Sequence, residues 1–446
     1  MREGRLGPSA RNPRGAGVPR PQPRLDEEPS VHTRSLQRVA AGDVLAEDVR
    51  DADEQVLLRV GTTLTDAYIA SLRARGVPAV RIADGAPDWV GVDDPLHAEV
   101  RRETSLTLRT LFSNVSGAAR QRFDDGTVPA NSAALATRLG EAPLSDGTAE
   151  GQLEATVSRL IDSVLEREVL DGLAQLKNHS DYTFTHSVEV AALAVGIGHR
   201  LGLSTSNLRD LATGCLLHDV GKSLVDSAVI DKPGPLDEAE RTLVKEHPEL
   251  GYEVIRRLHL ASVLPGQIAL QHHERQDGAG YPRGLHGSNR IRRTTQERVD
   301  PRTMMLLAEI CAVADIHNAI SSDRPYRPAM PAEEVMAVIE RNAGGHLNRE
   351  LVELLRRTVP VYPRGTWVQI LTGAYVGWRG QVTKTPLDHP YRPRILLALD
   401  DRLQALEEPR PLDCSDQHVD VRALAPEQPA TEPGCLAERT AERVAS

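Results

Sequence analysis

The sequence predicts a mainly α-helical bundle flanked by two small modules that are rich in β-strand. Between about residues 151 and 358, Leu, Val, Ile and Ala recur at helical spacing. Residues 361–424 instead contain stretches with the period of two that is typical of half-buried strands. Residues 31–87 alternate short apolar runs with turn signals such as Gly42-Asp43. The expected fold class is therefore mainly α, with a small N-terminal α+β module and a small C-terminal β-barrel-like module.

Composition and punctuation divide the chain into six segments. The Arg-, Pro- and Gly-rich N-terminus and the polar C-terminus cannot bury enough apolar surface to fold. Pro360 and Pro363-Arg364-Gly365 mark the end of the helical region. The expected segments are a disordered tail at 1–30, a small β-rich module at 31–90, a helix and linker at 91–150, the helical domain at 151–358, the β module at 359–425 and a second disordered tail at 426–446.

Single elements can be placed within these segments. Thr65–Arg75 has helical spacing behind an N-cap residue, and Ala79–Ile82 has the character of a strand. A polar amphipathic helix is expected over 95–122, whereas residues 123–150 have the composition of a linker. In the C-terminal module, strands are expected at 367–371, 380–383 and 394–399.

Bulk properties argue against several classes of protein. The formal net charge of −10 disfavours a general nucleic-acid binder. The four cysteines lack CxxC spacing, so neither a disulfide framework nor a zinc ribbon is expected, and a cytoplasmic location fits. No apolar run reaches the roughly 18 residues that a membrane span needs, so none is expected. The N-terminus also lacks the apolar region of a secretory signal.

Histidines and aspartates gather in the helical region as two doublets and three single residues. Neutral imidazoles and carboxylates suit divalent Fe, Mn, Ni, Co or Zn, and the lack of thiolates argues against a structural zinc site. A single histidine on an apolar helix face is more often a packed core residue than a ligand. So many in one helical domain nevertheless predict a metal site. They are His186, His218-Asp219, His247, His272-His273 and Asp315.

The helix expected around the first doublet carries one stripe of residues. The spacing i, i+4, i+7, i+11 places them on one face of a continuous helix, so a ligand and a cation should point into the same cavity. Asp219 lies about 100° round that helix from His218, where a carboxylate can bridge two ions. The stripe consists of Leu211, Cys215, His218 and Lys222.

Two signatures in this region resemble the HD-GYP family of metal-dependent cyclic di-GMP phosphodiesterases. His218-Asp219-Val220-Gly221-Lys222 is similar to the HD-x-GK motif, and residues 272–282 (HHERQDGAGYP) are similar to HHE-x-x-DG-x-GYP. The resemblance covers roughly residues 151–358. It implies an HD-type helical bundle that hydrolyses cyclic di-GMP to the linear dinucleotide, to GMP or to both. It also implies two divalent metal ions, with Fe or Mn ahead of Ni, Co or Zn.

The resemblance further implies roles for individual residues. Asp219 would bridge the ions, and Lys222 would contact the scissile phosphate, which makes these two the catalytic residues. Tyr281 and the backbone of Gly280 would shape the site and contact the nucleotide. Phosphate oxygens would be bound by Arg324 and Arg327. The implied metal ligands are His186, His218, Asp219, His247, His272, His273 and Asp315.

Three features depart from the family pattern. The VADxxDA pattern keeps Asp315 but has Asn318 in place of the second acid, and an amide supplies no negative charge. A basic insertion near 290–302 is expected to be a solvated loop, with a substrate lid or a partner contact as the alternative. Tyr182 stands four residues before His186, where a third ion would require a Glu. A neutral phenol is a poor ligand at neutral pH, so two ions are expected.

Two other functions stay open at this point. One is hydrolysis of another cyclic dinucleotide or of a guanine nucleotide by the same metal site. The other is a catalytically weak protein that senses the nucleotide, and Asn318 is the main feature in its favour. The expected partner is cyclic di-GMP and not a nucleic-acid polymer. Protein partners at the flanking modules or at 290–302, and a homodimer, are further alternatives.

Overall fold

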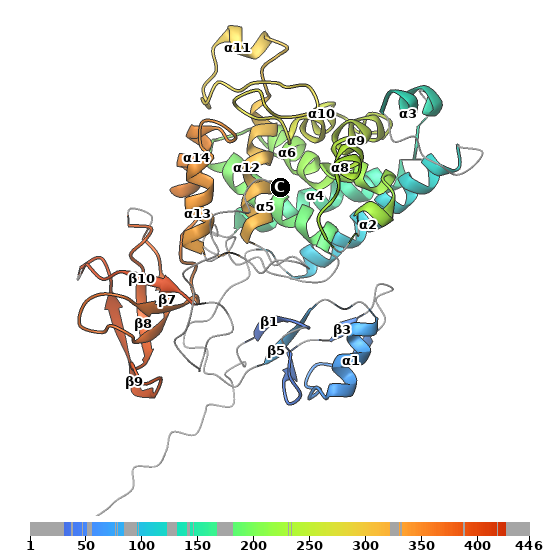
Figure 1. The fold of residues 1–446 in the computed structure, drawn as a ribbon. Coiled ribbons are helices and arrows are strands. Elements are labelled where there is room, and N and C mark those ends of the chain that lie inside the picture. The colour runs from blue at the N-terminus through green and yellow to red at the C-terminus, as the bar shows by residue number, and fades with distance from the viewer. Residues whose placement is uncertain are drawn as a thin grey trace, which may run out of the picture.

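The chain is mainly helical, with antiparallel sheets towards both ends (Figure 1). Expectations for the two tails, and for Arg324 and Arg327, lie outside the described residues. The computed structural model describes residues 31–36, 39–46, 48–50, 56–75, 77, 79–83, 96, 98–122, 132–140, 143–145, 147–166, 182–230, 232, 234–321, 330, 332–386, 389–416 and 418–424.

The N-terminal strands surround a small apolar core of their own. The order in the three-stranded antiparallel sheet is β1-β5-β2, and β3 pairs with β4. The predicted helix and strand are both present, and the Thr65 hydroxyl caps the helix by accepting from the Tyr68 N–H. Leu45, Leu64 and Leu72 are buried in this core. The elements are β1 (Val31–Ser35), β2 (Val44–Leu45), β3 (Val49–Arg50), β4 (Val56–Leu58), α1 (Asp66–Ala74) and β5 (Ala79–Ala83).

The helical domain is built round α5 (Tyr182–Arg200). Every residue of this helix from Thr185 to Gly198 is buried, because apolar and small residues occupy all of its faces. Helices α6 (Thr205–Leu217) and α12 (Leu306–Ser321) pack against α5, and Figure 1 shows them together at the centre of the domain. The other elements are α2 (Ala98–Arg120), α3 (Ser132–Leu139), α4 (Thr148–Glu166), η2 (Val220–Leu224), α7 (Ser227–Ile230), α8 (Glu238–Lys245), α9 (His247–Ile255), α10 (Leu264–Gln271), α11 (Thr295–Val299), α13 (Ala332–Arg341) and α14 (Arg349–Arg356).

The part of the chain with linker-like composition contains helical structure. Helix α3 lies within this segment. It is stabilised because Leu135 and Leu139 are buried against the helical domain. The buried Arg257 guanidinium then donates to the carbonyl of Ala136 at 3.1 Å and to that of Gly140 at 2.8 Å. The Gly140 carbonyl lies just beyond the end of α3, where no N–H of the helix can reach it, whereas that of Ala136 also accepts from the N–H of Gly140.

The C-terminal strands form one antiparallel sheet of order β10-β6-β7-β8-β9. The three predicted strands all lie in it. Among the described residues, β9 and β10 stand at its two edges and do not pair with each other. Val368 and Leu397 belong to the same apolar cluster as the helices, so this sheet packs on the helical domain. The strands are β6 (Trp367–Ile370), β7 (Arg379–Lys384), β8 (Arg394–Leu399), β9 (Ala405–Asp413) and β10 (Val421–Ala423).

Among the helices that the structure describes, none combines the length and the apolar character that crossing a membrane requires.

Candidate metal centre

The fold brings the predicted metal ligands together, and it does so mainly at helix ends. His218 and His272 are the first residues beyond α6 and α10, and His247 begins α9. Asp219 and His273 follow directly in the chain, whereas His186 and Asp315 lie within α5 and α12. Helix ends suit ligands because their side chains can converge from different directions on one point.

The expectation of a continuous helix from Leu211 to Lys222 is wrong. Helix α6 ends at Leu217, and Lys222 lies in the 3-10 turn η2. The chain turns here because η2 packs backbone to backbone against α9. A Cβ atom on Gly221 would lie 2.0 Å from the carbonyl oxygen of His247, so only glycine permits this approach. The turn places Asp219 beside His247, a contact that the sequence spacing did not predict.

The first group of predicted ligands consists of His186, His218 and Asp219, whose candidate donor atoms lie within 4.8 Å of one another. Asp315 adjoins this group, since its Oδ1 is 3.1 Å from Nε2 of His186. Nε2 of His218 is 3.3 Å from Oδ2 of Asp219. All four side chains are buried or nearly so.

The second group consists of His247, His272 and His273, again within 4.8 Å of one another. Oδ1 of Asp219 faces this group, at 3.3 Å from Nε2 of His247 and 3.9 Å from Nε2 of His272. The two oxygens of one carboxylate therefore point to different groups. Asp219 stands between them, where a bridging ligand would have to be.

Three imidazoles make the same local hydrogen bond, which orients their Nε2 atoms into the site. Nδ1 of His218, His247 and His272 each lies 2.7 Å from the carbonyl oxygen three residues back. A carbonyl only accepts, so each Nδ1 carries the proton and caps a helix end. The lone pair of a neutral ring is then on Nε2, the atom that faces the site. This is the arrangement that metal-binding histidines commonly show.

Without a cation, several of these contacts are unfavourable. Nε2 of His247 and Nε2 of His272 face each other at 3.2 Å, although Nδ1 holds the proton in both rings. Oδ1 of Asp219 is buried and makes no hydrogen bond. Buried polar atoms are rarely left in this state. A divalent ion bound by imidazole nitrogen and carboxylate oxygen would give each of these atoms a partner. The residues present therefore fit a metal.

The charge balance of the site agrees with this fit. Burial lowers the pKa of His247 and lowers that of His273 to about 3, and with the neighbouring imidazoles it holds the pKa of His272 well below its usual range. Burial also opposes the charged form of His218, but the adjacent Asp219 carboxylate outweighs it and raises the pKa of His218 to about 10. One imidazole of the cluster therefore holds a proton that a metal would displace.

We expect metal affinity to increase with pH because of this proton. A metal binds only the deprotonated imidazole of His218, whose pKa of about 10 keeps it protonated at neutral pH. Each rise of one pH unit between about pH 6 and 8 should therefore raise the Mn²⁺ affinity about tenfold. Calorimetric titration in buffers of different ionisation enthalpy would count the released proton. An affinity that is constant over this range would contradict the assignment.

Comparison with known proteins matches the middle of the chain. Residues 163–291, which contain both signatures, match the family model described as an HD domain. A cyclic di-GMP phosphodiesterase of Pseudomonas aeruginosa is 33% identical over 54% of this chain and 55% of that protein. The chain carries an HD domain of the HD-GYP type.

Two further relatives resemble this HD-GYP domain. A cyclic di-GMP phosphodiesterase of Thermotoga maritima is 34% identical over 42% of this chain and 47% of its own length. The 3'3'-cGAMP-specific phosphodiesterase 3 of Vibrio cholerae is 35% identical over 41% and 37%. The chain thus spans about half or less of the curated relatives it matches.

The GYP turn of the HD-GYP domain covers one side of the cluster. The ring of Tyr281 stacks on His273 with 4.8 Å between ring centroids. A Cβ atom on Gly280 would lie 2.5 Å from the backbone nitrogen of Arg275, so glycine is needed for the turn to fold back on the HHE segment. Glu274 holds the next stretch of chain, because its buried carboxylate accepts from the N–H groups of Arg283 and Leu285.

Two lysines of the HD-GYP domain lie beside the cluster, and the sequence singled out one of them. The ammonium of Lys222 donates to Oδ2 of Asp219 at 2.7 Å. Lys245, at the end of α8, lies over the ring of Tyr281 at 5.6 Å from the centroid. Lys245 belongs to neither signature. Its position two residues before His247 was the only feature of the sequence that could have indicated a place beside the cluster.

The basic insertion is both exposed and anchored. Helix α11 projects from the helical body (Figure 1), and Val299 on it is exposed. The Arg293 side chain, by contrast, is buried and pairs with the buried Glu309 of α12 at 2.5 Å. Asn348 also donates to Glu309, at 2.8 Å. A purely solvated loop would not carry this buried pair, so the base of the insertion is part of the fold.

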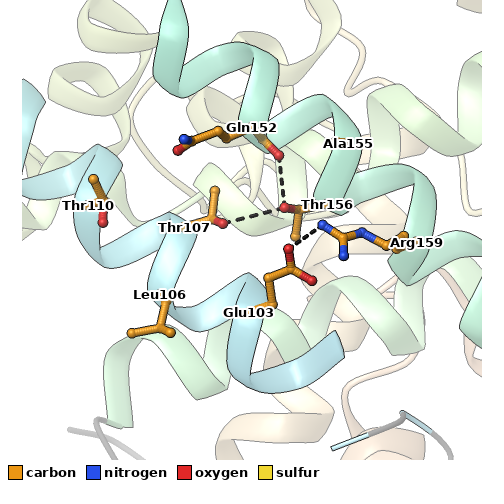
Figure 2. Close-up of a pocket in the computed structure, with 8 residues that line it drawn as sticks. All are labelled: Glu103, Leu106, Thr107, Thr110, Gln152, Ala155, Thr156 and Arg159. Carbon is orange, nitrogen blue, oxygen red and sulfur yellow. Dashed lines mark hydrogen bonds and ion pairs between the residues drawn. The ribbon is translucent and has the colours of Figure 1, made fainter. Parts of the chain in front are cut away.

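A separate polar pocket of about 350 Å³ lies between α2 and α4 (Figure 2). Several of its polar groups pair with one another: Arg159 pairs with Glu103, and the Thr156 hydroxyl donates to the carbonyl of Gln152 at 2.8 Å. None of the predicted site residues lines it. We assign no ligand to this pocket.

Proposed function

We propose that the protein is a metal-dependent phosphodiesterase that hydrolyses cyclic di-GMP to the linear dinucleotide, to GMP or to both. The observation that carries the proposal is the convergence of imidazole Nε2 atoms on the two oxygens of Asp219 in a buried site. Lys222 supplies a cation at the same carboxylate. The relatives named as cyclic di-GMP phosphodiesterases support the choice of substrate.

We also propose that two divalent ions occupy the site, with Asp219 between them. His186, His218 and Asp315 would hold one ion, and His247, His272 and His273 would hold the other. When bound, such a pair activates water and neutralises the charge of a phosphodiester. Fe or Mn is the proposed identity, with Ni, Co or Zn as alternatives, because nitrogen and oxygen ligands suit all of them.

The protein's own residues would then bind and orient the substrate. Lys222 would bind a non-bridging oxygen of the scissile phosphate, where an ammonium stabilises charge that develops during attack. Burial raises the pKa of Tyr281, so its hydroxyl stays protonated. Its ring, stacked on His273, would cover one side of the cluster. Gly280 would hold that ring in place, and Arg324 and Arg327 would bind the remaining phosphate oxygens.

Metal removal should abolish turnover, and metal return should restore it. Chelator-treated protein would be reconstituted anaerobically with Mn²⁺ or Fe²⁺, and the nucleotides would be separated by chromatography. Metal analysis should give about two ions per active chain. Reconstituted protein that leaves cyclic di-GMP intact would refute the enzyme proposal, and a third fully occupied ion would refute the two-ion arrangement.

A second substrate belongs in the same assay. The relative named as 3'3'-cGAMP-specific is as similar to this chain as the cyclic di-GMP enzymes are. Cyclic di-GMP and 3'3'-cGAMP should therefore be compared at equal concentration. We expect a higher kcat/KM for cyclic di-GMP, and the reverse order would reassign the substrate.

Lys245→Ala is expected to raise the KM for cyclic di-GMP about tenfold and to leave kcat within about threefold. Lys245 offers a cation at the ring of Tyr281 without touching a proposed ligand, so it can bind substrate but contributes little to the chemical step. Lys384→Ala, at an exposed lysine of β7, is the matched control. An unchanged KM in Lys245→Ala would exclude Lys245 from the substrate site.

The organisation of the whole chain is a further proposal. We propose that residues 31–90 form a β-rich module, that 151–358 form the catalytic domain after the helix and linker of 91–150, and that 359–425 form a barrel-like β module. We also propose a cytoplasmic location, which the free, buried Cys215, Cys311 and Cys414 support. Protein partners of the flanking modules or of residues 290–302, and a homodimer, stay predictions.

A further inference from the structure

A buried group of four side chains joins α5 to α12 behind the first ligand group. His186 and Glu189 lie one turn apart on α5, opposite Asp315 and Asn318 on α12. Nδ1 of His186 is 2.6 Å from Oδ1 of Asn318, and Nδ2 of Asn318 is 2.6 Å from Oε2 of Glu189. Glu189 is 3% exposed and Asn318 is 4% exposed. The ligand His186 is therefore linked to a buried carboxylate through one amide.

The carboxylate decides which way the amide points. An ionised carboxylate only accepts hydrogen bonds, so it must face the NH₂ group of Asn318. The amide oxygen is then left to face Nδ1 of His186, which has to donate. With the proton on Nδ1, the lone pair of a neutral His186 ring is on Nε2, 3.1 Å from Oδ1 of Asp315. Both of these atoms are presented to the proposed metal.

We propose that Glu189 is a positioning residue that acts through Asn318 on His186. The inference rests on the proposed metal site and explains the departure from the family pattern at position 318. The negative charge expected at that position is not lost but stands one hydrogen bond farther from the ligand. Partners of this kind fix the tautomer and orientation of a metal-binding histidine, and their loss typically weakens metal affinity by about 10- to 100-fold.

The same geometry couples positions 189 and 318 to each other. An Asp at 318 would place two carboxylates in contact where Asn318 and Glu189 now meet at 2.6 Å. Two like charges at this distance cannot both stay ionised at low cost, so one acid would have to take up a proton or move away. A Gln at 189 would remove this conflict, because its NH₂ group can donate to the new carboxylate. Each residue therefore suits its present partner.

The test is a double-mutant cycle with Mn²⁺ affinity as the readout, measured by calorimetric titration of metal-free protein. Glu189→Gln no longer enforces the amide orientation and should weaken Mn²⁺ binding about tenfold. Asn318→Asp alone should weaken it by a similar factor. The double variant should bind Mn²⁺ within about threefold of the unmodified protein, because the acid and the amide have only exchanged places.

Glu150→Gln is the matched control for loss of a buried acid. Glu150 is buried on α4 and accepts from the Ser145 hydroxyl at 2.6 Å, away from the ligands. This variant should lower the thermal midpoint and leave Mn²⁺ affinity unchanged. The proposal is overturned if Glu189→Gln binds Mn²⁺ as well as the unmodified protein, or if the losses of the two single variants simply add. The Mn²⁺ affinities of the variants could follow this pattern while the unmodified protein leaves cyclic di-GMP intact. That result would refute the phosphodiesterase function and not the role of Glu189.

Discussion

Asp219→Asn is expected to reduce turnover of cyclic di-GMP by about 10³-fold or more. Its two carboxylate oxygens face the two ligand groups, and an amide would offer one oxygen and one NH₂ group without charge. Loss of a bridging charge should cost several kcal/mol of transition-state stabilisation, and about 4 kcal/mol corresponds to 10³-fold in rate. Steady-state rates with saturating Mn²⁺ would give the size of the loss.

The fold should survive this change, since the two side chains have nearly the same shape. Circular dichroism should show unchanged helical content in Asp219→Asn. Asp226→Asn makes the same change a few residues away, where the exposed Asp226 accepts from the N–H of Ala228 at 2.9 Å. Because Asn also serves in such turns, this control should keep full activity. Activity of Asp219→Asn within about tenfold of the unmodified protein would rule out a bridging role.

Lys222→Ala is expected to lower kcat by about 10²-fold while the protein keeps its metal. An ammonium that stabilises developing charge on a phosphate contributes on this scale. The hydrogen bond from Lys222 to Oδ2 of Asp219 adds a second expectation. The lysine competes with a cation for that oxygen, so its removal should leave Mn²⁺ affinity equal or higher. Rates and Mn²⁺ titrations on the same preparation would test both parts.

Lys222→Arg supplies the comparison for this prediction. It keeps the charge but replaces a compact ammonium with a planar fork, so it should restore activity only in part. Lys384→Ala serves as the control for removal of one positive charge. Loss of metal from Lys222→Ala would show that the lysine supports the ligands and does not bind the phosphate.

The choice of histidines and aspartates as ligands followed from the sequence, because each type of donor is a local property. Two signatures together with His186, His247 and Asp315 indicated one metal site, and the structure brings these residues into contact. Helical periodicity likewise predicted the helical domain, and alternation predicted strands β6, β7 and β8. The helical and strand predictions succeeded because the period of a helix or strand is present in consecutive residues, whereas the role of each ligand stays a prediction.

Helix ends and contacts between distant segments were decided by tertiary structure. The stripe from Leu211 to Lys222 failed as a continuous helix because Gly221 packs against the backbone of α9, a contact between segments far apart in the chain. The linker-like composition of 123–150 hid α3, whose leucines are buried only by the folded domain. The composition of residues 290–302 also could not predict that Arg293 pairs with the buried Glu309.

Asn318 shows most clearly the difference between what the sequence predicts and what the tertiary structure decides. From the sequence, an amide in place of an acid meant a lost charge. The structure places the buried Glu189 carboxylate against that amide, on a different helix. The sequence by itself determined which atoms could bind a metal. Only the tertiary structure decided how four of the five imidazoles are oriented, because the partner of Nδ1 in His186, His218, His247 and His272 is set by helix ends and by packing between helices.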